Sequence, residues 1–323
     1  MHTRLTDALG VDHPVMLAGM GGVSYHRLVA AVSEAGGFGC LGASMMSPGR
    51  MVEEIDRVRG LTAKPFGVDL LTALPHDMPE QVTRIIDGGA TVFVAGLGVP
   101  RDVIEQCHSR NVLVVNMCGK VRHAVAAVAA GCDIVVAQGT EAGGHTGLVG
   151  TLPLVAQIVD AVGHQVPVVA AGGITDGRGL AAALALGADG GWVGTRVIAT
   201  DEARAVPGYK DTLVRIHEDD TVISRAYTGK TCRVVRNNWT AYYDEHPEEV
   251  EGFPAQVMKA THEGANHLGA DERAEGVDPD REFWPAGQGA GAIHDIVPAG
   301  ALVRQFVADA QAAAERLMSY SRS

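Results

Sequence analysis

The sequence has few aromatic residues, few cysteines and no long apolar segment. Aromatic residues make up 5% of the 323 residues, and the five cysteines include no Cys-x-x-Cys pair. A zinc site built from cysteines is therefore not expected, and an odd number of unpaired thiols is typical of a reducing compartment. No segment has the roughly 20 apolar residues that a membrane span needs, and the first residues do not resemble a secretory signal. We expect a cytoplasmic protein with no metal and no membrane contact.

Positive charge is also scarce. The chain has 26 Lys and Arg against 38 Asp and Glu, which gives a net charge of -12, and the basic residues form no cluster. Nucleic acid and anionic lipid are polyanions, so sequence-independent binding to either is not expected. The composition favours a small-molecule partner, and assembly as a homodimer stays open.

Eight short apolar runs are present in the first 200 residues. They begin near residues 14, 38, 65, 91, 111, 133, 166 and 190, and most are bounded by Gly or Pro. Continuous rather than alternating apolarity is typical of strands buried on both faces of a parallel sheet. Helical stretches, most ending in Gly, lie between the runs. Eight strand–helix units predict an α/β fold, a (β/α)8 TIM barrel over residues 1–200; a doubly wound open sheet is the alternative.

The composition changes after residue 200 to polar helical segments and long loops. We predict that residues 201–298 form a small, mainly helical cap over the active site. Residues 299–323 include the amphipathic stretch ALVRQFVADAQAAAERLM. We expect this last helix to pack back on the barrel through its apolar face.

The predicted sixth strand leads into VAQGTEAGGHTGLVG, residues 136–150. Active sites of such barrels lie in the loops at the carboxyl ends of the strands. Glycines allow the backbone to approach a flat ligand closely, and His145 would then project into a pocket. The alternative is a packing histidine in a loop that the glycines merely turn, but the position at the barrel rim favours function.

Glycines also end the predicted seventh and eighth strands, at Ala171-Gly172-Gly173 and at Gly194-Thr195-Arg196. The loops after these two strands often bind phosphate in barrels of this type, through backbone N–H groups and a helix N-terminus. We predict such a site here, although glycines that only cap and pack helices would give the same letters. A third loop, LAGMGGVS at 17–24, either lines one face of the ring of a bound ligand or only makes a tight turn before the next helix.

Taken together, these motifs resemble the nitronate monooxygenase family, once called 2-nitropropane dioxygenases. The FMN-dependent enoyl reductases of bacterial fatty-acid synthesis are close relatives of that family. The shared motifs are AGMGG, AGGFGCLGA, AQGTEAGGHTG, PVVAAGGITDGRGLAAALALGA and VGTR in the barrel, and AGQGAG at 286–291. The resemblance implies an FMN-dependent oxidoreductase with non-covalently bound FMN.

The same resemblance implies the site residues. His145 would be the catalytic histidine beside the flavin. The cofactor-binding positions would be Ala18, Gly19, Met20, Asp69, Gln138, Gly143, Gly144, Ala171, Gly172, Gly173, Gly194, Thr195 and Gln288.

Three positions leave the subfamily open. Typical nitronate monooxygenases have Ala-Pro-Met after strand one, whereas Ala18-Gly19-Met20 is closer to the Gly-Gly-Met of the reductases. Typical members have Asn where this chain has Asp69, which only accepts hydrogen bonds when ionised. Gln138, in contrast, favours the monooxygenases, because the reductases tend to have an acidic residue there.

Three functions follow as hypotheses. A monooxygenase would oxidise alkyl nitronates with O₂ to a carbonyl compound and nitrite. A reductase would use NAD(P)H to reduce an enoyl thioester of CoA or of an acyl carrier. The basic residues Lys230, Arg233 and Arg236 would then either bind the phosphates of that substrate or simply lie on a solvent-exposed face of a strand or helix. The third hypothesis is a flavin-free barrel with a binding role.

Overall fold

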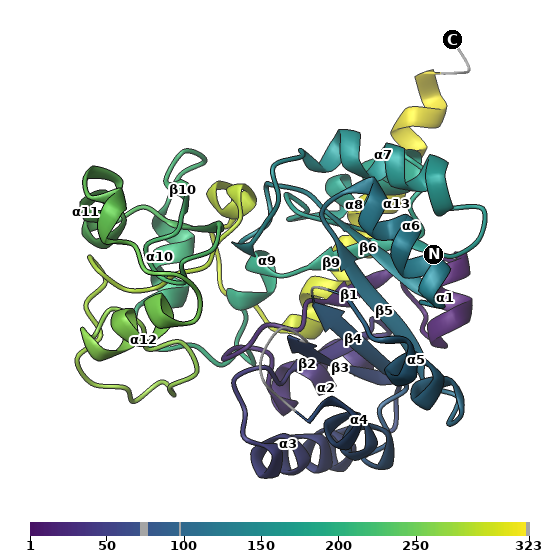
Figure 1. The fold of residues 1–323 in the computed structure, drawn as a ribbon. Coiled ribbons are helices and arrows are strands. Elements are labelled where there is room, and N and C mark those ends of the chain that lie inside the picture. Colours follow the sequence, from purple (N-terminus) through teal and green to yellow (C-terminus); the bar gives the residue numbers. More distant parts are fainter. Residues whose placement is uncertain (72–76, 97, 321–323) are drawn as a thin grey trace.

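Eight parallel strands close into a barrel that forms the body of the protein (Figure 1). The computed structural model describes residues 1–71, 77–96 and 98–320. The strand order is β1-β9-β8-β6-β5-β4-β3-β2, and a parallel bridge between Met16 and Phe38 brings β1 beside β2. The predicted (β/α)8 barrel is confirmed. Its strands are β1 (Val15–Leu17), β2 (Gly39–Gly42), β3 (Phe66–Leu71), β4 (Val92–Gly96), β5 (Leu113–Cys118), β6 (Ile134–Gln138), β8 (Val168–Ala171) and β9 (Gly190–Val193).

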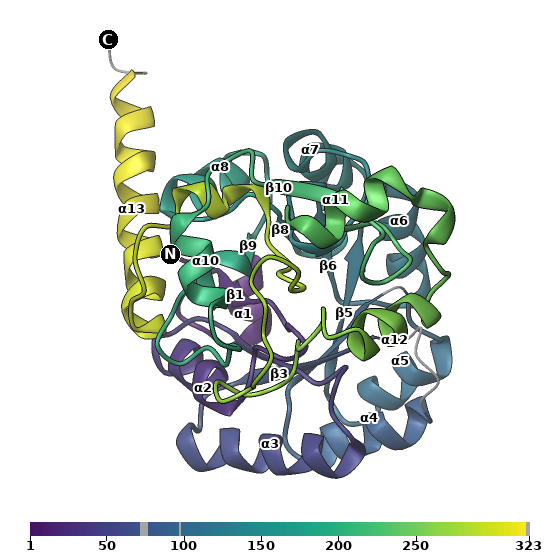
Figure 2. The ribbon, with the colours of Figure 1, turned by 90° about the vertical axis from the view of Figure 1, so that its left-hand side faces the viewer.

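Helices cover the outside of the barrel, as Figure 2 shows. They are α2 (His26–Glu34), α3 (Pro48–Leu61), α4 (Met78–Asp87), α5 (Arg101–His108), α6 (Val121–Ala130), α7 (Thr151–Val162) and α8 (Gly177–Ala185). The short α9 (Thr195–Ile198) follows β9 and lies between the barrel and the rest of the chain (Figure 1). The buried apolar faces of the helices, such as Leu28 and Ile55, form one continuous core with the outward side chains of the strands. This arrangement explains the continuous apolarity of the strand sequences, since both faces of each strand are buried.

A second apolar cluster fills the inside of the barrel. It includes inward residues from several strands, among them Met16, Phe38, Val94 and Trp192. The helix α1 (Arg4–Leu9) precedes the first strand and contributes Leu5 to the same cluster. The barrel is therefore packed at the amino ends of its strands, and space for a ligand remains at their carboxyl ends.

The cap lies beside those carboxyl ends (Figure 1). It contains α10 (Tyr209–Arg215), β10 (Thr221–Ser224), β11 (Cys232–Val235), α11 (Asn238–Glu245), η1 (Pro247–Glu249), α12 (Ala255–His262) and η2 (Gln288–Ala292). Its own core includes Tyr227, Trp239, Tyr243 and Phe283. The two strands pair antiparallel with each other, an element that the sequence analysis did not anticipate.

The last helix, α13 (Ala299–Tyr320), packs against α8 and α2 on the outside of the barrel. The α8–α13 contact is close: a Cβ on Gly177 would lie 2.2 Å from the carbonyl oxygen of Phe306. Beyond this contact the carboxyl end of α13 projects from the body (Figure 2). Residues 321–323 of the expected helix lie outside the described residues. No helix in the described ranges combines the length and apolarity that a membrane span requires.

Candidate active site

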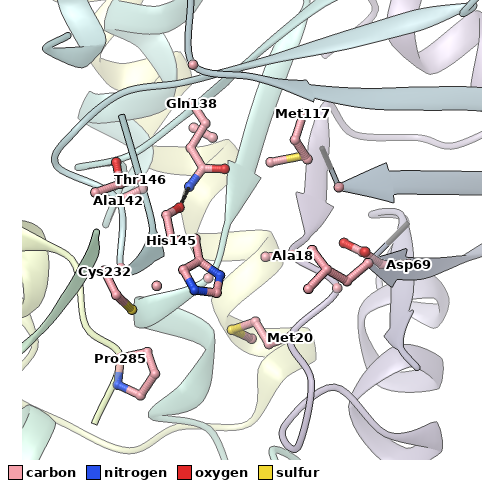
Figure 3. A pocket seen from close by; sticks show the side chains of 18 of the residues that line it. Ala18, Met20, Asp69, Met117, Gln138, Ala142, His145, Thr146, Cys232 and Pro285 are labelled. Carbon is pink, nitrogen blue, oxygen red and sulfur yellow. Dashed lines mark hydrogen bonds between the residues drawn. The ribbon is translucent and has the colours of Figure 1, made fainter. Parts of the chain in front are cut away.

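A cavity of about 1060 Å³ opens between the cap and the carboxyl ends of the strands (Figure 3). Loops after several strands line it, and cap residues including Thr228 and Phe253 contribute as well. Much of the wall is apolar, for example Met20, Met117 and Leu268. The cavity thus lies where barrel enzymes place their active sites.

The structure brings together all but one of the catalytic and cofactor-binding residues that the family resemblance implied. Those that line the cavity are Ala18, Gly19, Met20, Asp69, Gln138, Gly143, Gly144, His145, Ala171, Gly172, Gly173, Gly194 and Thr195. Gln288 does not line it: its side chain is exposed, although its neighbours Gly287 and Gly289 do. The backbone N–H of Gln288 donates to the carbonyl of Glu141 at 2.9 Å.

His145 is held by strand pairing between barrel and cap. Residues Gly144 and His145 form the short strand β7 (Gly144–His145), which pairs antiparallel with β11, so that His145 lies opposite Cys232. From the barrel side, the Gln138 amide donates to the His145 carbonyl at 2.8 Å. The glycines of this loop thus allow a β-strand pairing as well as an open pocket, and the backbone of the histidine is fixed from two sides.

The imidazole of His145 has one ring nitrogen engaged. Its Nε2 lies 3.1 Å from the hydroxyl oxygen of Thr228, which in turn donates to the carbonyl of Lys230 at 3.1 Å. The same hydroxyl accepts from the backbone N–H of Lys230 at 3.3 Å. In the tautomer with the proton on Nε2, the hydroxyl also accepts from the ring and the lone pair is on Nδ1. Burial, and secondarily the charge of Lys230, lower the pKa of His145 below its ordinary value of 6.5. The ring is therefore neutral at neutral pH and can accept a proton.

Three glycines at the rim leave room for a ligand. A Cβ on Gly144 would meet nothing within 4 Å, and one on Gly194 would make only ordinary contacts at 3.5 Å. Gly173 has a φ of +72°, which favours glycine, and a Cβ there would come no closer than 3.5 Å to a neighbour. The backbone N–H groups of Gly173 and Thr195 donate to no other described residue. Glycine-lined space with free N–H groups is suited to an anionic group such as a phosphate.

Two contacts hold this part of the rim together. The carboxylate of Glu141 accepts from both the backbone N–H and the hydroxyl of Thr151, at the start of α7. The N–H of Gly287 donates to the Thr195 hydroxyl at 2.9 Å. The loop at 286–291 thus ties the loop after β6 to the end of β9, which gives its glycines a structural role.

The three basic residues considered for a thioester substrate, Lys230, Arg233 and Arg236, have different environments. Lys230 lines the cavity, with its Nζ 4.2 Å from the ring centroid of Phe253, and no carboxylate of a described residue pairs with it. Arg233 is buried and donates to the carbonyl of Thr140 at 2.8 Å. Arg236 is exposed and outside the cavity lining. Of these three cations, Lys230 is therefore the one placed to contact a ligand bound in the cavity.

Sequence reasoning missed Thr228 and Phe253. Thr228 is 83 residues from its partner His145, and the edge of the Phe253 ring faces the imidazole at 6.4 Å between centroids. Both come from the cap, whose sequence has no repeated pattern to predict its contacts.

Cys118, at the end of β5 and next to Gly119, is buried, and burial raises the pKa of its thiol to about 12.

Comparison with known proteins agrees with this geometry. The family model described as nitronate monooxygenase matches residues 2–81 and 77–309. The chain belongs to the nitronate monooxygenase family. It is 34% identical over 304 residues to the "Probable nitronate monooxygenase" of Staphylococcus saprophyticus, covering 79% of this chain and 84% of that protein.

Two solved structures of similar shape extend the comparison. FabK from Thermotoga maritima has a TM-score of 0.90 at 34% identity, with 99% of each chain covered. The nitroalkane oxidase from Streptomyces ansochromogenes has a TM-score of 0.83 at 32% identity, covering 97% of this chain and 99% of that one. The chain is therefore an oxidoreductase, and family membership implies a flavin cofactor, FMN or FAD.

Proposed function

We propose that this enzyme oxidises alkyl nitronates with O₂, using FMN, to a carbonyl compound and nitrite. The observation that carries the proposal is that a neutral imidazole, His145, and the cation Lys230, which no carboxylate of a described residue pairs with, line the same cavity. A nitronate is an anion that forms when a nitroalkane loses its α-proton. The site thus offers a charge that attracts the anion and a base that can generate it.

The residues present fit FMN. The N–H groups of Gly173 and Thr195 would hold its terminal phosphate, and the loop Ala18–Met20 would support its ring. A cradle closed by two loops favours the terminal phosphate of FMN over the longer FAD. When bound, FMN would supply an electron-accepting ring for the oxidation of the nitronate by O₂.

His145 has two tasks in this proposal. With a neutral nitroalkane, Nδ1 takes the α-proton while Nε2–H stays bonded to Thr228. With a preformed nitronate, no proton has to leave, and the ring orients the substrate. The cap, residues 201–298, supplies Thr228 and Phe253, and we propose that it keeps water from the imidazole.

A second function, reduction of an enoyl thioester with NAD(P)H, is supported by a different observation. The cavity has an extensive apolar wall that includes Met45 and Val257, more than a short nitronate needs. An acyl chain would fit such a wall, and the similarity to FabK agrees with this reading.

Product analysis distinguishes the two functions. Flavin-loaded enzyme given an alkyl nitronate in air should consume O₂ and release nitrite without NAD(P)H. Enoyl thioester with NAD(P)H should give little oxidation of the nucleotide. Loss of NAD(P)H that depends on the thioester, with no nitrite from nitronates, would replace the first function by the second. Mass spectrometry of the released cofactor checks for FMN; FAD alone would refute that assignment.

A further inference from the structure

Asp69 is a half-buried carboxyl group on the wall of the cavity. It lies on β3 opposite Val94 of β4 and beside Gly42 of β2, and it lines the cavity. In Figure 3 it lies next to Ala18 on the wall of the cavity. Among the described residues, its carboxylate oxygens have neither an ion-pair partner nor a hydrogen-bond donor.

The loop after β1 is shaped around this carboxyl. A Cβ on Gly19 would lie 2.2 Å from the Cβ of Asp69 and 2.8 Å from its Oδ2. Glycine is therefore required for the backbone of this loop to pass over the Asp69 side chain. A ligand that rests on Ala18 and Met20 of the same loop is adjacent to the carboxyl group.

A carboxylate without a donor costs much more free energy to bury than the neutral acid does. Desolvation raises the pKa of Asp69 to about 8. The neutral acid differs from the ionised form in one further respect, because it carries an O–H donor. At neutral pH the group can thus donate a hydrogen bond to a ligand in the cavity.

We propose that Asp69 is a neutral carboxylic acid that donates a hydrogen bond to an acceptor atom of the bound flavin ring, and that its ionisation makes flavin binding and reduction sensitive to pH. This inference rests on the proposed flavin site. Asp69 is a positioning residue in this account, not a base. Its ionisation removes the donor and places a negative charge beside a ring that must accept electrons, which weakens binding and disfavours reduction.

Few ionisable groups lie near Asp69. From β2 the Cys40 thiol faces Asp69, and burial together with Asp69 raises the pKa of that thiol well above 9.0. The described parts of β1, its following loop up to Ser24, and β4 carry no ionisable side chain. Elsewhere in the cavity lining, the ionisable groups outside the cysteines are Lys120, His123, Glu141, His145, Tyr209 and Lys230. His145 and His123 both have a pKa lowered below 6.5, so they titrate separately from Asp69.

The variant Asp69→Asn is the matched test, because its amide keeps a donor at every pH and cannot ionise. Infrared difference spectra of the two flavin-loaded proteins should show the C=O stretch of a protonated acid in the wild type at pH 6, lost by pH 9.5. The flavin absorbance of the wild type should shift as Asp69 ionises, with a midpoint above the pKa of about 8 of the flavin-free protein, because a flavin that accepts the hydrogen bond favours the protonated acid. The Asp69→Asn protein should lack that shift, while a His145→Ala control should keep it.

Flavin affinity gives an independent readout. The Kd of the wild type should rise by about tenfold between pH 6 and pH 9.5, the loss of one net hydrogen bond, and stay flat in Asp69→Asn. Absence of the protonated-acid band at pH 6, or the same flavin shift in Asp69→Asn, overturns the inference. Neither measurement uses a nitronate, so an enzyme that shows both effects but releases no nitrite refutes only the proposed substrate. A protein that binds no flavin refutes both.

Discussion

Thr228 orients the imidazole of His145, because its hydroxyl oxygen lies 3.1 Å from Nε2 of the ring. The variant His145→Ala should keep the fold and the flavin but lower kcat with a neutral nitroalkane by about 10²–10⁴, the range for a positioned base. The loss with a preformed nitronate should be smaller. Flavin content, Tm and kcat measured on one preparation check this. Equal losses on both substrates would leave His145 as an orienting group, and a lower Tm with unchanged turnover per flavin would make it a packing residue.

The pH dependence of activity follows from the same imidazole. A neutral ring is the active form, so kcat/KM with a neutral nitroalkane should fall as the pH drops through the lowered pKa of His145, below 6.5. Above that pH this limb should be flat. A kcat/KM profile from pH 4.5 to 7.5 tests the sign, and an activity that rises toward acid would contradict the base role.

Asp69 also affects stability. Its pKa is raised to about 8 in the folded protein, against about 3.9 in unfolded chains. The folded state therefore binds one more proton than the unfolded state between these values, and the stability from Asp69 is lost as the pH rises toward 8. The Tm of Asp69→Asn should thus exceed the wild-type Tm by more at pH 9 than at pH 5. Thermal denaturation at the two pH values measures this, and an equal difference at both would mean that Asp69 is already ionised at pH 5.

The role of the loop after β9 in flavin binding can be tested by adding one methyl group at Gly194. Gly194 has a φ of -112°, which any residue can adopt, and a Cβ there would make only ordinary contacts with the protein. Gly194→Ala should therefore preserve the fold but weaken flavin binding by one to two orders of magnitude, about 1–3 kcal/mol of overpacking. Gly60→Ala on α3, where a Cβ meets nothing within 4 Å, is the control. Unchanged flavin affinity in Gly194→Ala would place the cofactor elsewhere.

The barrel strands were predictable from the sequence, whereas the sheet that holds His145 was not. Each barrel strand is buried on both faces, so a short run of consecutive apolar residues such as TVFVAGL is enough to identify it. The strand β7 has two residues in a glycine-rich loop, and β11 includes the buried Arg233. Their pairing joins segments far apart in the chain and leaves no local pattern. The glycine and histidine positions of the site were predictable because loops at strand ends lie together, but the Thr228 contact depends on how the cap folds.

At the scale of the whole molecule, the net charge of -12 repels an anionic substrate, and Lys230 opposes this locally. Lys230→Gln should raise KM for a nitronate by about three- to tenfold and leave KM for the neutral nitroalkane unchanged. Arg236→Gln, which removes an exposed cation outside the cavity lining, is the matched control. Equal effects of both variants would mean that overall charge, rather than the site, attracts the anion.

Anaerobic mixing of the flavin-loaded enzyme with an alkyl nitronate shows whether the nitronate itself reduces the flavin. The substrate and the flavin are then the only redox partners in solution, so any loss of flavin absorbance reports electron transfer from the nitronate. The account predicts rapid bleaching by the nitronate without NAD(P)H and recovery of the absorbance when O₂ is admitted. Bleaching by NAD(P)H alone, with recovery on addition of an enoyl thioester and no response to the nitronate, would contradict it.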